Sequence, residues 1–93
     1  MKNLKKLALI LRAMGVTANV LKESITYNDG TRYDYTFLEV RRAGCVWNIW
    51  NDNGWIFEVN LYINKDCVCC SLYYTSLFDV VQRISLDYAK YGK

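Results

Sequence analysis

The stretch from residue 45 to residue 63 constrains the fold most strongly, because its pattern is that of a β-hairpin with one buried face. Apolar side chains occupy every second position in its later half, at Trp55, Phe57, Val59, Leu61 and Ile63. This period of two is typical of a strand that buries one side. The turn signal Asp52-Asn53-Gly54 precedes it, and Gly readily adopts the positive φ that tight turns need. We therefore expect antiparallel strands at 45–51 and 55–63.

Two similar turn signals divide the preceding residues into two more strands. Asn28-Asp29-Gly30 separates strands at 20–27 and 31–41, and Arg42-Ala43-Gly44 leads into the strand at 45. Three-residue loops at the three turns place Ile25 opposite Tyr33, Phe37 opposite Ile49, and Ile49 opposite Phe57. One buried face then collects Leu21, Ile25, Tyr27, Tyr33, Tyr35, Phe37, Cys45, Trp47, Ile49, Trp55, Phe57, Val59, Leu61 and Ile63.

A fifth strand follows the turn around Asn64-Lys65-Asp66, which lacks Gly. Its facing depends on the length of this loop, because side chains alternate between the two faces. A loop of two or four residues turns Val68, Cys70 and Leu72 toward the core. A loop of three residues instead turns inward Cys67, Cys69, Ser71 and Tyr73.

Amphipathic helices are predicted on both sides of the strands. The first covers 2–14, ends at Gly15, and has a core stripe formed by Leu4, Leu7, Ala8, Leu11 and Met14. The second covers 75–91, begins with a capping box from Ser76 to Asp79, and has a core stripe formed by Leu77, Val81, Ile84 and Tyr88. Two i,i+4 ion pairs, Asp79–Arg83 and Arg83–Asp87, are expected on its solvent side, and Leu9 and Leu86 should be exposed.

These elements predict one α+β domain that spans residues 1–93. The order is helix, five strands, helix (αβββββα), with the strands in an antiparallel meander. Because each helix has a single apolar stripe, both helices should pack on the same face of the sheet.

The composition argues against an enzyme. The chain of 93 residues has no His, which is the commonest general base and metal ligand. The four Cys residues lie at 45, 67, 69 and 70, which is a poor arrangement for a tetrahedral zinc site. We expect no catalytic residues, no cofactor and no metal. The cysteines should be small reduced hydrophobes, with Cys67 and Cys69 on the outer face and open to oxidation in vitro.

The outer face of the sheet is the candidate functional surface, because it is unusually apolar in the predicted register. A solvated face should carry Lys, Thr and Glu, and large exposed apolar patches usually mark interfaces. We therefore expect this face to bind a protein partner or a second copy of the chain. The candidate partner-binding residues are Trp50, Ile56, Leu38, Val40, Tyr62 and Tyr73.

Weak binding of nucleic acid is the alternative function. The net charge is only +3, far below that of a dedicated nucleic-acid-binding domain. Aromatic side chains on an open sheet can nevertheless stack on bases. The candidate anion-binding residues are Lys2, Lys5, Lys6, Arg12, Arg41 and Arg42.

Other features bear on the setting in which the protein acts. The apolar run after the first lysines is five residues long and is interrupted by Arg12, whereas signal-peptide cores need about 7–15 apolar residues. We expect a cytoplasmic protein without a membrane partner. The small size and the abundance of Asn, Lys, Tyr and Ile are typical of a phage or mobile-element protein, which suggests an inhibitor of a host enzyme.

Overall fold

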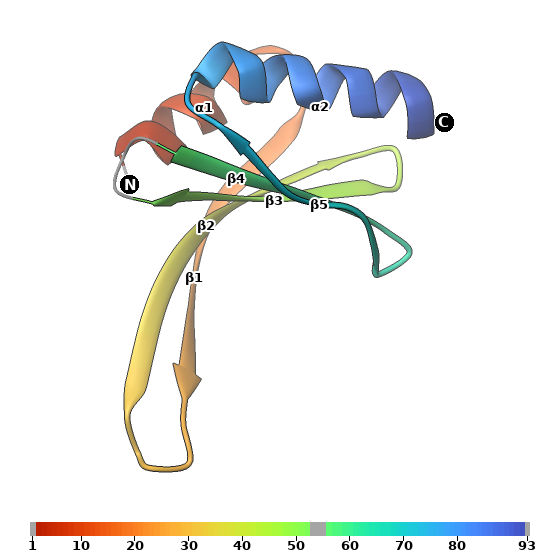
Figure 1. Cartoon of the computed structure of the whole chain (residues 1–93). Helices are drawn as coiled ribbons and strands as arrows, with labels where there is room; N and C mark the ends of the chain where they lie inside the picture. The colour runs from red at the N-terminus through yellow and green to blue at the C-terminus, as the bar shows by residue number, and fades with distance from the viewer. Residues whose placement is uncertain (1, 53–55, 93) are drawn as a thin grey trace.

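A computed structural model describes residues 2–52 and 56–92 of the chain. The elements are α1 (Lys2–Ala13), β1 (Thr17–Thr26), β2 (Arg32–Arg42), β3 (Cys45–Asp52), β4 (Ile56–Ile63), β5 (Asp66–Tyr74) and α2 (Leu77–Tyr91). The strands form one antiparallel sheet in the order β1-β2-β3-β4-β5. Both helices lie on the same side of the sheet (Figure 1). The predicted αβββββα architecture is therefore confirmed.

The helix ends follow the predicted capping chemistry. Gly15 has a φ of 82°, its N–H donates to the carbonyl of Arg12, and the N–H of Val16 donates to the carbonyl of Leu11. This pair of bonds is a Schellman motif, which satisfies the last carbonyls of α1. At the other helix, the Ser76 hydroxyl accepts the N–H of Phe78 over 3.2 Å and so caps the start of α2.

The turn between β2 and β3 differs from the prediction. It contains two residues, Ala43 at φ 49° and Gly44 at φ 84°, and Arg42 pairs directly with Cys45. Two positive φ values in succession define a type I′ turn, whose twist suits a hairpin. The predicted three-residue loop is wrong by one residue. Ile49 consequently lies opposite Leu38 rather than opposite Phe37.

This single slip reverses the facing of β1 and β2, because strand side chains alternate with a period of two. Leu38 and Val40 are each 0% exposed and belong to the core, so their predicted place on the outer face is wrong. Ala18 and Val20 pair with them on β1 and also face the helices. The residues predicted inside, Leu21, Ile25, Tyr33, Tyr35 and Phe37, lie instead on the face away from the helices.

The facing of β3 and β4 agrees with the prediction. Trp47 and Ile49 pair with Leu61 and Val59, and all four are buried beneath the helices. The pairing itself differs by two residues, since Ile49 lies opposite Val59 rather than opposite Phe57. A shift of two leaves the faces unchanged. The turn residues Asn53 and Gly54, and Trp55 with its predicted inward side chain, lie outside the described residues.

The fifth strand follows a two-residue turn, one of the loop lengths considered, but does not keep the facing expected for that length. Asn64 and Lys65 both have positive φ, and Ile63 pairs with Asp66. Two irregularities then shift the register, so that Leu61 pairs with Cys69 and Val59 pairs with Leu72. Leu72 and Cys69 therefore face the helices, whereas the predicted inward residues Val68 and Cys70 are exposed.

One carboxylate of α2, that of Asp87, lies in the core of the protein. The sequence had predicted it on the solvent side of the helix. Asp87 is 2% exposed, and its side chain accepts a hydrogen bond from Trp47 Nε1 over 3.1 Å. Arg83 forms an ion pair of 2.8 Å with the other oxygen of Asp87. The described ion pairs of Arg83 do not include the predicted one with Asp79. The buried stripe of α2 is centred on Val80 and Ile84.

Candidate partner-binding arm

The outer half of the β1–β2 hairpin projects from the domain as a free two-stranded arm. We define the arm as residues 22–36. Pairing between β2 and β3 begins at Leu38 and Ile49, so the described residues of β2 before that point pair with β1 alone. Figure 1 shows the hairpin reaching well below the layer of the other strands, and the longest extent of the molecule is 44 Å. Neither helix covers either face of the arm (Figure 1).

Stacked aromatic rings line the face of the arm that points away from the helices. We call Tyr33, Tyr35, Phe37 and Trp50 the aromatic row. Ring centroids lie 6.1 Å apart from Tyr33 to Tyr35 and from Tyr35 to Phe37. Trp50 lies 5.1 Å from both Tyr35 and Phe37. These separations are within the range of favourable aromatic contacts, so the row forms one continuous strip from the body to the arm.

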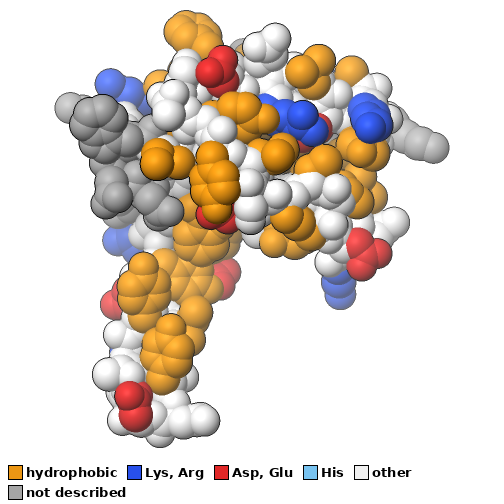
Figure 2. All heavy atoms as spheres, in the orientation of Figure 1, with side chains coloured by type: hydrophobic (Ala, Val, Ile, Leu, Met, Phe, Trp, Pro, Cys, Tyr) orange, Lys and Arg blue, Asp and Glu red, His pale blue; other side chains and the backbone are white. Residues whose placement is uncertain are grey.

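Exposure increases along the aromatic row toward the tip of the arm. Phe37 is nearly buried where Trp50 stacks on it, Tyr35 is half-buried, and Tyr33 is 58% exposed. Ile25 lies directly opposite Tyr33 on β1 and is also exposed. In Figure 2 hydrophobic side chains follow the arm from the body almost to its tip. The body therefore anchors the row at its base, and its outer end is open to a partner.

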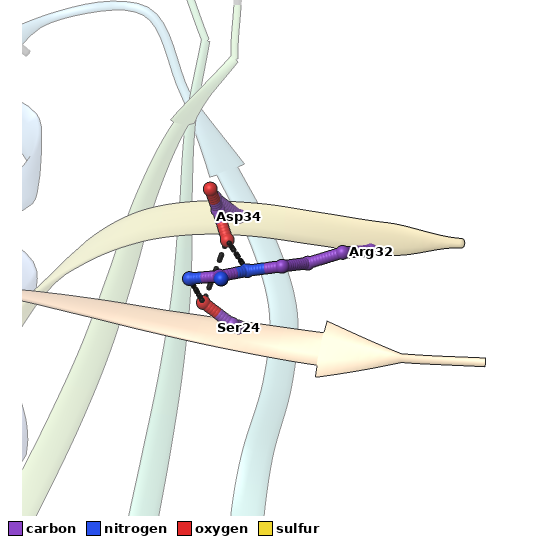
Figure 3. A network of polar contacts seen from close by, with 3 residues as sticks. All are labelled: Ser24, Arg32 and Asp34. Atoms are coloured by element: carbon purple, nitrogen blue, oxygen red, sulfur yellow. Dashed lines mark hydrogen bonds and ion pairs between the residues drawn. The ribbon is translucent and has the colours of Figure 1, made fainter. Parts of the chain in front are cut away.

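The opposite face of the arm is polar, and its side chains form hydrogen bonds with one another. Arg32 Nε donates to the carboxylate of Asp34 over 2.8 Å, and the Ser24 hydroxyl donates to the same oxygen over 2.6 Å (Figure 3). The bond from Ser24, followed by that from Arg32, lowers the pKa of Asp34 below its usual value. The Arg32 guanidinium also contacts the Ser24 hydroxyl at 3.0 Å. The arm thus has one aromatic face and one polar face.

The charge of the arm is slightly acidic, although the chain as a whole is basic. The arm holds two basic residues, Lys22 and Arg32, and three acidic ones, Glu23, Asp29 and Asp34, for a net charge of −1. Glu23 belongs to the aromatic face, where its carboxylate accepts a 2.8 Å hydrogen bond from the Tyr35 hydroxyl. This bond raises the pKa of Tyr35. Asp29 accepts the N–H and the hydroxyl of Thr31 within the turn at the tip.

The predicted partner-binding residues separate into three groups. Trp50 belongs to the aromatic row, and across the same face it pairs with Glu58, which pairs with Tyr73, itself 61% exposed. Ile56 is exposed next to Glu58 on β4. Tyr62 lies further along the face, in a shallow hollow lined also by Arg41 and Lys65. The other two, Leu38 and Val40, lie in the core and take no part.

The predicted anion-binding residues come together only in pairs, since Arg41 and Arg42 line one hollow and Lys5 and Arg12 line another. Arg12 turns to β1 and donates to the carbonyl of Ala18 over 2.7 Å. Arg41 pairs with Glu39 on the outer face of the sheet at 2.6 Å, whereas Arg42 lies 3.9 Å above the ring of Tyr88 beside the helices. Lys5 and Lys6 are exposed on α1, and the side chain of Lys2 lies outside the described part of the structure. The five residues whose side chains are described therefore lie on both faces of the protein and do not form one cluster.

Most of the exposed aromatic row was missed by the sequence prediction, which assigned Tyr33, Tyr35 and Phe37 to the core. One signal was available. The predicted phase for β2 also turns Glu39 and Arg41 inward, because they share the parity of Phe37. The opposite phase buries Leu38 and Val40 and leaves both charged residues in water.

Within 2–52 and 56–92, no group of three or more His, Cys, Asp or Glu side chains is arranged to hold a metal ion. Neither described helix is long and apolar enough to cross a membrane. Comparisons with protein-family models, curated proteins and solved structures found no significant match.

Proposed function

We propose that this chain is a small binding protein that docks its arm onto a protein partner. The observation that carries this proposal is the aromatic row, which is anchored by Trp50 and Phe37 at its base and exposed at Tyr33. Aromatic side chains are typical anchors of protein interfaces because they bury a large area with few rotatable bonds. Rings that are already stacked lose less conformational freedom on binding.

The chemistry of the arm favours a partner with an apolar groove and a basic rim. The outer end of the aromatic face offers Tyr33 and Ile25, and the Glu23 carboxylate lies on the same face. A basic rim complements both this carboxylate and the net charge of −1 of the arm. The described part of β2 at 32–36 also has an open edge toward β3, where a strand of the partner could add main-chain hydrogen bonds.

A second copy of the chain is a weaker partner for this surface. Two arms packed face to face would bring like charges together, since each arm has a net charge of −1 and carries Glu23 on its aromatic face. Nucleic acid is disfavoured by the same carboxylates and by the dispersed positions of the basic residues. Both alternatives remain as outcomes of the experiment below.

We propose that the protein acts as an inhibitor of its partner. An arm that fills a groove would block that groove without any chemistry of its own, which accords with the small size and the absence of His. A phage or mobile-element origin, with a host enzyme as the target, is the specific version of this proposal.

The test uses two matched double variants of the arm. Ile25→Ser/Tyr33→Ser changes a directly opposed pair on the aromatic face. Lys22→Arg/Thr36→Ser changes a directly opposed pair on the polar face without changing the charge of the arm, and is the control. Proteins retained by the immobilised wild-type chain are identified by mass spectrometry, purified, and titrated against all three forms.

We expect the aromatic-face variant to weaken binding of a retained protein at least tenfold, and the control to change binding less than threefold. Equal losses in the two variants would overturn the proposal, because the arm would then have no preferred face. Light scattering that shows a concentration-dependent dimer dispersed by Ile25→Ser/Tyr33→Ser would assign the surface to a second copy. Retention of nucleic acid alone, lost steeply as salt rises, would favour the alternative function.

A further inference from the structure

Strand β5 carries a disulfide that is independent of the arm. Cys67 is bonded to Cys70, with their Cα atoms 6.1 Å apart, and both residues are exposed on the edge strand of the sheet. The predicted oxidation-prone pair, Cys67 and Cys69, is therefore not the one that is joined. Cys69 pairs with Leu61 on the helix-covered face, and its sulfur lies 3.6 Å from the Arg83 guanidinium.

The disulfide coincides with both irregularities of β5. Tyr62 pairs with Cys67 and Leu61 with Cys69, so Val68 is an extra residue between them. Leu61 pairs with Cys69 and Val59 with Leu72, so Cys70 and Ser71 together oppose the single residue Asn60. Asn60 stabilises this second bulge by accepting the N–H of Ser71 over 2.7 Å. Ser71 itself has a φ of 56°, which an L residue adopts at a cost.

The disulfide and a regular strand exclude each other. In an extended strand, residues three apart point to opposite faces and their Cα atoms are about 10 Å apart. A disulfide requires Cα atoms within about 7 Å. The 6.1 Å separation of Cys67 and Cys70 is reached only because the bulges shorten the strand between them.

The sequence of this segment favours the regular strand when the bond is open. Continuing the pairing of Ile63 with Asp66 without bulges would place Val68 opposite Leu61 and Cys70 opposite Val59, on the face that the helices cover. In the bulged strand Val68 is 43% exposed. Regular pairing would therefore bury Val68 and relieve the positive φ of Ser71, while Cys69 turns outward and Leu72 moves from Val59 to Phe57 on the same face.

We propose that Cys67 and Cys70 form a reversible redox site whose disulfide holds β5 in its bulged form. A low-molecular-weight thiol such as glutathione is the reductant. Its thiolate attacks one sulfur, which breaks the protein S–S bond and forms a mixed disulfide, and a second glutathione releases oxidised glutathione. Two electrons and two protons pass from two glutathione molecules to Cys67 and Cys70, which become thiols. Reduction thereby frees residues 67–74 to pair with β4 in the regular register set by Ile63 and Asp66.

The test combines redox titration with amide hydrogen exchange of the full chain. The protein is equilibrated in mixtures of reduced and oxidised glutathione, alkylated, and mapped by mass spectrometry. We expect Cys67 and Cys70 to gain or lose alkylation together, with a mass difference of 2 Da between the two forms before alkylation. Hydrogen exchange at residues 67–71 should differ at least tenfold between the forms, and cross-strand contacts between Val68 and Leu61 should appear by NMR only after reduction.

Two variants separate the disulfide from its surroundings. Cys70→Ser should show the exchange pattern of the reduced protein in every buffer, whereas Cys69→Ser should keep the 2 Da difference and the response of the strand. Identical exchange in both redox forms of the wild-type chain would overturn the proposal. It would also be overturned if Cys67 and Cys70 carried separate glutathione adducts without ever forming the intramolecular bond.

Discussion

The indole Nε1 of Trp47 donates a 3.1 Å hydrogen bond to the carboxylate of Asp87, across forty positions of the sequence. Both residues are buried, and this bond links the middle of the sheet to α2. Arg83, one turn earlier in α2, pairs with the other carboxylate oxygen at 2.8 Å. A buried carboxylate is tolerated because both of its oxygens have partners.

Replacing this carboxylate should be among the most destabilising changes in the protein. Asp87→Ala leaves the Trp47 N–H and the half-buried Arg83 without their partner, so we expect a loss of about 3 kcal/mol in the free energy of unfolding. Asp79→Ala is the matched control, because Asp79 is exposed in the first turn of the same helix and should cost about 0.3–1 kcal/mol. Urea denaturation of both variants provides the comparison, and similar losses would contradict the role of Asp87.

Replacing alanine with glycine should have opposite effects at two positions. It should stabilise the protein at Ala43 in the type I′ turn and destabilise it at Ala89 in α2. Ala43 has a φ of 49°, which costs an L residue about 1 kcal/mol, so Ala43→Gly should raise the free energy of unfolding by roughly 0.5–1 kcal/mol. Ala89→Gly, on the exposed side of α2, should lower it by a similar amount. Chemical denaturation measures both, and two changes of the same sign would argue against the two-residue turn.

Two rings of the aromatic row should contribute very differently to stability. Phe37 is nearly buried beneath Trp50, so Phe37→Ala should cost about 3 kcal/mol. Tyr33 is mostly exposed, and Tyr33→Ala should change stability by no more than about 0.5 kcal/mol. Thermal and urea unfolding of the two variants test the gradient of burial along the row. A large loss for Tyr33→Ala would mean that the Tyr33 ring is packed within the folded chain, and it would contradict this gradient.

The thiol of Cys45 should make the protein less stable in alkali. Burial, and then the nearby charge of Asp87, raises the pKa of Cys45 above that of an unfolded thiol, about 8.5. A raised pKa means that the unfolded chain loses this proton first. The associated stability is complete below the unfolded pKa and is lost as the pH rises through the folded value. We expect the free energy of unfolding to fall more steeply above pH 8.5 in the wild-type chain than in Cys45→Ala, as measured by urea titrations from pH 7 to pH 10. Parallel curves would contradict this assignment.

Much of the secondary structure could be predicted because its signals are local. Gly15 and Ser76 bound the helices through hydrogen bonds to residues within a few positions, and Asn28-Asp29-Gly30 sets the pairing of Ile25 with Tyr33. The candidate site could be predicted only in part. Trp50, Ile56 and Tyr62 were correctly placed on the outer face, because the facing of β3 and β4 depends on their own alternation. Tyr73 on β5 also lies on this face, because the two irregularities before it add two residues and leave its parity unchanged.

The facing of β1 and β2 could not be obtained from the turn itself. Arg42-Ala43-Gly44 is compatible with a loop of two or three residues, and the two lengths turn opposite faces of the hairpin toward the helices. The choice depends on burial elsewhere, since the two-residue turn places Leu38 and Val40 in the core and leaves Glu39 and Arg41 outside. Asp87 is a similar case. It continues the buried stripe of Val80 and Ile84, but a carboxylate is accommodated there because the indole of Trp47, on a distant strand, donates to it.

The amino-acid sequence by itself determined the number, order and antiparallel pairing of the elements, because periodicity, caps and turn residues act over a few positions. Tertiary structure decided which face of the β1–β2 hairpin is aromatic and open, and that a carboxylate belongs in the core. Those outcomes depend on which groups meet when distant segments pack, and strand alternation converts a difference of one turn residue into the opposite surface.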